Sequence, residues 1–124
     1  MTASSTPSMR RLLYVEDEVI VALDVAEALA RDLGFAVDVA HNLSAARSLI
    51  AQGHYDCALL DMNLGHGERS TVLIPELDAA GTEVVFASGY NRDEVEDIGD
   101  RTLVEKPFTM TEIRAVFADE PDPS

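Results

Sequence analysis

The chain has 124 residues and a formal net charge of −14. This length fits one domain that can bury a core, and its single cysteine, Cys57, excludes an internal disulfide. So acidic a domain argues against nucleic acid and against an anionic membrane surface, whereas basic protein partners and divalent cations fit it. No apolar run reaches the ~18 residues of a membrane span, and residues 1–8 lack an apolar signal core. We therefore expect a cytoplasmic protein.

Between two polar ends, strand-like apolar runs alternate with segments whose apolar residues recur at helical spacing. In chain order we expect a strand at 11–15, a helix at 19–33, a strand at 35–40, a helix to about 53, a strand at 55–60, a helix near 71–80, a strand at 83–87, a short helix at 91–98, a strand at 102–105 and a final helix to 117. Residues 1–9 are expected to form a disordered lead, 10–118 the domain and 119–124 a disordered tail.

Local signals mark several helix ends. Gly34 is expected to end the first helix, and Asn42 or Ser44 to cap the second. Thr109 or Thr111 is expected to cap the last helix. Because strands and helices alternate with short connections, the chain predicts an α/β fold, a (βα)5 parallel sheet with helices on both faces.

Polar side chains follow four of the expected strands, at their carboxyl ends. They are Glu16 and Asp17, Asp61, Ser88, and Lys106. In an open parallel sheet these ends converge on one crevice, where ligands bind. Carboxylates gathered so closely repel each other unless a cation joins them, so the pattern predicts a Mg²⁺ site.

The order and spacing of these four segments resemble the receiver domain of two-component response regulators, over roughly residues 11–117. The segments Val85–Tyr90 and Asn63–Glu68 also resemble a subgroup of single-domain receivers that has a Phe-Ala-Thr-Gly-Tyr-like motif. The resemblance supports a doubly wound, flavodoxin-like sheet with strand order 2-1-3-4-5.

The resemblance also implies a role for each residue of the site. Asp61 would accept a phosphoryl group as the nucleophile. Asp17 and Asp61 would bind Mg²⁺ directly, together with the main-chain carbonyl of Asn63, and Glu16 would act through water. Family members often have Asp where this chain has Glu16.

Two further residues of the resemblance act on the phosphoryl oxygens. Lys106 would neutralise them as a point charge, and Ser88 would hydrogen-bond one of them. The peptide bond before Pro107 is commonly cis in this family.

Each residue also has a simpler interpretation. Asp61 could be a turn or capping residue, and Glu16 and Asp17 could be acids that favour the start of the first helix. Lys106 could be a surface lysine, and Ser88 part of a Ser-Gly turn. His41, His54 and His66 have no metal-ligand spacing, and His66 is expected on the surface, although it could approach the site.

The chain departs from the family pattern in two places. Leu103 stands where the family usually has a switch aromatic, and the stretch from Ser88 to Lys106 is short. We therefore expect the aromatic toggle to be absent or replaced by Tyr90, and the switch to run through residues 88–100.

The leading hypothesis is a stand-alone receiver that takes phosphate from a histidine kinase or a histidine phosphotransfer protein and then alters its binding to a downstream target. It would not be an enzyme on other molecules, beyond its own phosphorylation and autodephosphorylation. The alternative is a relay or sink in a phosphorelay. A pseudo-receiver is disfavoured by the intact site, and a hydrolase by the lack of a second acid after Asp61.

Overall fold

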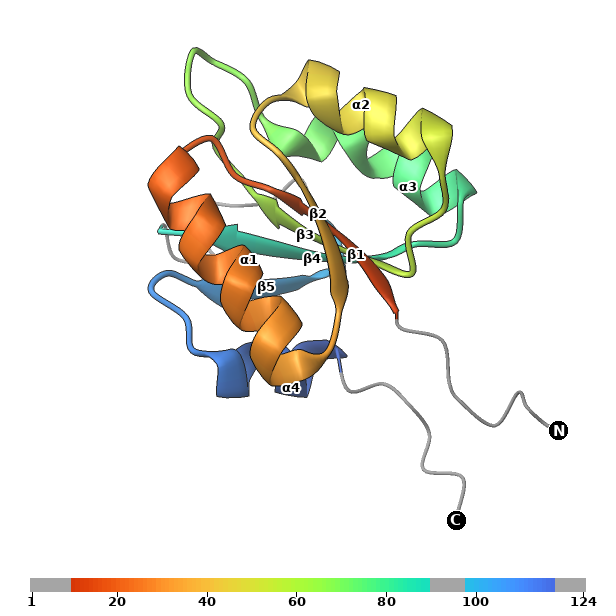
Figure 1. Ribbon diagram of the computed structural model, residues 1–124. Coiled ribbons are helices and arrows are strands. Elements are labelled where there is room, and N and C mark those ends of the chain that lie inside the picture. Colours follow the sequence, from red (N-terminus) through yellow and green to blue (C-terminus); the bar gives the residue numbers. More distant parts are fainter. Residues whose placement is uncertain (1–9, 90–97, 118–124) are drawn as a thin grey trace, which may run out of the picture.

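The computed structural model describes residues 10–89 and 98–117, and Figure 1 shows their arrangement. A five-stranded sheet has the order β2-β1-β3-β4-β5, and every pair of neighbouring strands is parallel. The strands are β1 (Arg11–Val15), β2 (Ala36–Ala40), β3 (Cys57–Asp61), β4 (Glu83–Ser88) and β5 (Thr102–Glu105). The predicted doubly wound α/β fold and its strand order are confirmed.

Helices cover both faces of the sheet. In Figure 1, α1 (Val19–Leu33) and α4 (Met110–Phe117) lie on one face, and α2 (Leu43–Gln52) and α3 (Ile74–Ala79) lie on the other. Successive strand residues point to opposite faces. Along β1, for example, Leu13 and Val15 join the core under α2 and α3, whereas Leu12 and Tyr14 join the core under α1 and α4. Burial on both faces explains why the central strands read as continuous apolar runs.

The helix ends follow local chemistry. Gly34 adopts the left-handed conformation that ends α1, with φ +78°. Asn42 caps α2 by accepting the Ala45 N–H at 2.8 Å. The Thr109 hydroxyl oxygen accepts the Glu112 N–H, and the Thr109 N–H donates to Glu112 Oε1. These two hydrogen bonds form a reciprocal capping box. The cap of α2 is thus Asn42 rather than Ser44, and the cap of α4 is Thr109 rather than Thr111.

The third helical segment differs from the expected single helix. It begins as a 3₁₀ turn, η1 (Ser70–Leu73), and continues as α3. Pro75 lies at the start of α3, where its missing N–H removes no helical hydrogen bond. The short helix expected at 91–98, and Tyr90, lie outside the described residues apart from Ile98, which is buried.

Candidate functional site

A pocket lies at the carboxyl ends of three strands of the sheet. Seven residues from the ends of β1, β3 and β5 and from the loops after them line it: Glu16, Asp17, Glu18, Asp61, Asn63, Gly65 and Lys106. The fold therefore brings together all the residues predicted for the site except Ser88. Glu18 and Gly65 are additions that strand-end reasoning did not provide.

Three carboxylates face one another in this pocket. Glu16, Asp17 and Asp61 each offer an oxygen, and these oxygens lie within 4.8 Å of one another. Glu16 is 1% exposed and Asp61 is 7% exposed, while Asp17 is half-buried. Oxygen ligands gathered in this way could hold a divalent metal ion.

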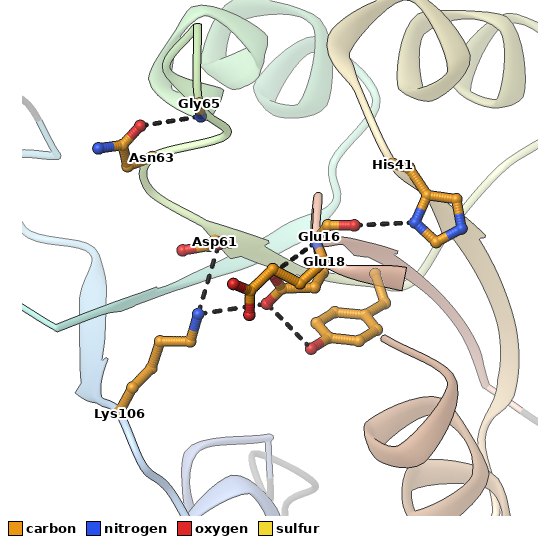
Figure 2. A network of polar contacts seen from close by, with 8 residues as sticks. Glu16, Glu18, His41, Asp61, Asn63, Gly65 and Lys106 are labelled. Atoms are coloured by element: carbon orange, nitrogen blue, oxygen red, sulfur yellow. Dashed lines mark hydrogen bonds and ion pairs between the residues drawn. The ribbon is translucent and has the colours of Figure 1, made fainter. Parts of the chain in front are cut away.

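Lys106 is the cation that balances this cluster. Its Nζ lies 3.2 Å from Glu16 Oε1 and 3.4 Å from Asp61 Oδ2. Figure 2 draws both contacts as dashed lines. These contacts set it apart from an ordinary surface lysine. Its peptide bond to Pro107 is cis, as the family resemblance implies.

Burial and charge shift the pKa values at the site. Desolvation and the charge of Glu16 raise the pKa of Asp61 to about 7, against the opposing effect of Lys106. Burial alone would lower the pKa of Lys106, but the charges of Asp61 and Glu16 outweigh it and raise that pKa. Asp61 therefore ionises reluctantly in the metal-free protein, and a bound cation would favour its ionised form.

The protein itself engages both carboxylate oxygens of Glu16. Oε2 accepts the Glu18 N–H at 3.1 Å, at the start of α1. Oε1 receives Lys106 and, at the longer distance of 3.4 Å, the hydroxyl of Tyr14. Burial and the neighbouring carboxylates raise the pKa of Tyr14, so its phenol stays protonated and donates. Glu16 thus contacts both the start of α1 and the site. Because both of its carboxylate oxygens already accept hydrogen bonds from the protein, Glu16 is better suited to contact a metal ion through water than to bind it directly.

The loop after Asp61 closes the other side of the pocket. Asn63 Oδ1 accepts the Gly65 N–H at 3.0 Å. Gly65 has φ +82°, and a Cβ atom there would lie 3.3 Å from Asp17 Oδ2. A glycine therefore both permits this turn and leaves room beside Asp17.

Ser88 and two histidines complete the comparison with the predicted site. Ser88 is buried at the end of β4, where its carbonyl accepts the Lys106 N–H at 2.9 Å, but it is not among the lining residues. His66 is exposed and outside the pocket, as expected. His41, for which the sequence indicated no role, lies half-buried with Nδ1 2.9 Å from the Glu16 carbonyl oxygen.

The chain matches a known protein family over most of its length. The family model of the response regulator receiver domain matches residues 12–118. The chain belongs to this family. It is therefore a receiver domain of two-component signalling.

Relatives and solved structures agree with this placement. The transcriptional regulatory protein DltR of Streptococcus agalactiae is 34% identical over 110 residues, which cover 85% of this chain and 49% of that protein. The chain thus spans about half the length of the curated relatives it matches. SdrG from Sphingomonas melonis is 32% identical, with a TM-score of 0.76 and coverage of 91% of this chain and 97% of that one.

A third similar protein carries ligands. It is a response regulator from Burkholderia pseudomallei, 27% identical, with a TM-score of 0.74 and coverage of 86% of this chain and 65% of that one. Its structure contains a phosphorylated aspartic acid and a calcium ion.

The remaining predictions concern membranes and nucleic acid. Within residues 10–89 and 98–117, no helix is long and apolar enough to cross a membrane. DltR is named as a transcriptional regulatory protein. This name conflicts with our expectation that the protein has no nucleic-acid partner. That expectation came from the charge of this domain, which spans only part of such a protein.

Proposed function

We propose that this receiver is a phosphorylation-dependent switch that accepts a phosphoryl group on Asp61 in the cytoplasm. The observation that carries the proposal is the position of Asp61, which shares one pocket with two further carboxylates and lies 3.4 Å from the Lys106 ammonium. The phosphorylated aspartate in the Burkholderia structure supports it.

The chemistry follows from the donor set. An Asp61 carboxylate oxygen attacks the phosphorus of a phosphohistidine, an O–P bond forms and the N–P bond breaks. The electron pair returns to the imidazole of the donor. Mg²⁺, held by Asp17, Asp61 and the Asn63 carbonyl, would neutralise the phosphoryl oxygens. Lys106, which pairs with Asp61 before the reaction, would then pair with a phosphoryl oxygen.

The output of such a domain is a change in protein binding. Ser88 is buried at the end of β4 and joined through its main chain to Lys106, so a phosphoryl group that attracts its hydroxyl would move the chain that follows. Leu103, half-buried in the core under α2 and α3, has no ring or hydroxyl to report that change.

The beginning of α1 offers a surface for the phosphodonor. Val19, Ile20 and Leu23 are 52%, 82% and 64% exposed, and this patch begins two residues after Asp17. Asp24 and Glu27 border a shallow groove there. A donor protein that presents a phosphohistidine must cover the pocket, and an apolar face with basic neighbours would complement this patch.

Phosphotransfer with two donors tests the function. A phosphorylated histidine kinase or histidine phosphotransfer protein should label the wild-type chain in the presence of Mg²⁺, and so should acetyl phosphate. Ile20→Asp should slow transfer from the protein donor while leaving labelling by acetyl phosphate unchanged. Val72→Asp, at an exposed position on η1, is the matched control. Failure of the wild type to accept phosphate from either donor would refute the proposal.

The same assay separates the switch from a relay or sink. Rapid return of the label to a histidine phosphotransfer protein would favour the relay. A lasting label, with a Ser88→Ala variant that is phosphorylated but does not change its partner binding, would favour the switch.

A further inference from the structure

The main chain of Glu16 is held on both sides by the junction between β2 and α2. Pairing between β1 and β2 ends at Val15 and Ala40. One residue later, the Glu16 N–H donates to the Ala40 carbonyl at 3.0 Å, and His41 Nδ1 lies 2.9 Å from the Glu16 carbonyl oxygen. The imidazole thus adds a side-chain contact where the regular ladder stops.

The chemistry of this contact fixes the direction of the hydrogen bond. A carbonyl oxygen can only accept, so His41 must carry a hydrogen on Nδ1 and donate it. At 2.9 Å the bond has the usual length for N–H···O.

The position of the bond connects it to the metal-binding carboxylates. The Glu16 carbonyl belongs to the peptide that joins Glu16 to Asp17, and a peptide group is planar. Holding its oxygen therefore sets the direction in which Asp17 leaves the strand. Figure 2 shows His41 on the opposite side of the Glu16 main chain from Lys106, and His41 does not line the pocket.

We propose that His41 is a positioning residue for the phosphoryl-transfer site. Its Nδ1–H holds the Glu16–Asp17 peptide, and so orients the two carboxylates that meet Asp61. The inference rests on the proposed function, because it assigns His41 a role in binding the divalent ion that phosphorylation requires.

A purely structural role for His41 is the competing explanation. His41 precedes Asn42, the cap of α2, so a substitution could act by loosening that helix. The cap itself is made by the Asn42 side chain and the Ala45 N–H, and it does not involve the imidazole. The two explanations therefore predict different responses to variants that keep or move the donor.

Three substitutions make that distinction. In His41→Asn the amide nitrogen is as many bonds from Cα as Nδ1, so it can donate to the Glu16 carbonyl. In His41→Gln the amide nitrogen takes the place of Nε2, and in His41→Ala there is no donor. Titration calorimetry would measure Mg²⁺ affinity, acetyl phosphate would measure the labelling rate, and thermal melts would report stability. His54→Ala is the control, since the His54 side chain is 61% exposed beside Asp56, before β3 begins, and does not line the pocket.

His41→Ala and His41→Gln should bind Mg²⁺ about tenfold more weakly, the lower range for losing a group that orients metal ligands. His41→Asn should keep an affinity within about threefold of wild type, and His54→Ala should match wild type. Unchanged Mg²⁺ affinity in His41→Ala would overturn the inference. Equal losses of Mg²⁺ affinity in all three His41 variants, in proportion to their losses of thermal stability, would also overturn it. A wild-type protein that neither binds Mg²⁺ nor becomes labelled would instead overturn the proposed function.

Discussion

Replacing Asp61 by asparagine should stabilise the metal-free protein at pH 8. The pKa of Asp61 is raised from 3.8 to about 7 by burial and by Glu16, so its ionised form is disfavoured in the folded state. At about 1.36 kcal/mol per pKa unit, this difference sets a ceiling of about 4 kcal/mol. Because the site can relax and admit water, we expect a gain of about 2 kcal/mol for Asp61→Asn.

The sign of the pH dependence follows from proton binding. Between about pH 4 and pH 7 the folded protein holds the Asp61 proton more tightly than the unfolded chain does, so the wild type loses stability as pH rises. The penalty is complete above pH 7 and is absent below pH 4. The advantage of Asp61→Asn should therefore be largest at pH 8 and should shrink as the pH falls.

Thermal melts in a chelator and in Mg²⁺ would check this prediction. At pH 8 in a chelator, Asp61→Asn should melt about 5–10 °C above wild type. Mg²⁺ should reverse the order, because it stabilises the protein that binds it. Asp56→Asn is the control, since Asp56 lies just before the opposite end of β3 and accepts the Arg11 N–H at 2.8 Å. An Asp61→Asn protein that melts at or below the wild-type temperature in chelator would refute the crowding of these carboxylates.

Three further variants test separate parts of the site. Asp17→Ala should weaken Mg²⁺ binding by roughly 1–3 kcal/mol in calorimetry, and equal affinity would place the metal elsewhere. Gly65→Ala should weaken Mg²⁺ binding more than Gly67→Ala, because both have positive φ but only a Cβ at Gly65 would meet Asp17, at 3.3 Å; equal effects would show that backbone strain alone matters. Lys106→Ala should raise the pKa of Asp61 above its wild-type value in an NMR titration of the metal-free protein, since it removes the nearby cation. An unchanged or lowered pKa would contradict the pairing.

Much of the fold follows from local sequence patterns. The helical spacing of apolar residues in Val19–Leu33, with Gly34 after it, fixes α1 to the residue. Continuous apolar runs mark the buried strands, and the alternation of strands with helices predicts that the strands are parallel. The 3₁₀ turn before Pro75 was not predicted, because Ser70–Leu73 carries no local signal that separates it from α-helix.

The candidate site also has one part that the sequence predicts and one part that it does not. Asp61, Asp17 and Lys106 follow strands, so topology alone brings them together. The contact of His41 with Glu16 joins residues 25 apart in sequence through the end of the β1–β2 ladder, and nothing local in the sequence indicates it. Tyr14 reads as an apolar strand residue, yet its hydroxyl reaches Glu16 at the edge of the core.

The central claim is that Asp61 is the residue that receives the phosphoryl group. Peptide mass spectrometry after incubation with acetyl phosphate and Mg²⁺, with hydroxylamine trapping, tests it most directly. The account predicts one acyl phosphate, on Asp61, which hydroxylamine converts to a hydroxamate with release of phosphate. This product should be absent in Asp61→Asn and in chelator. An adduct on another carboxylate of the wild type, or undiminished labelling of Asp61→Asn, would contradict the account.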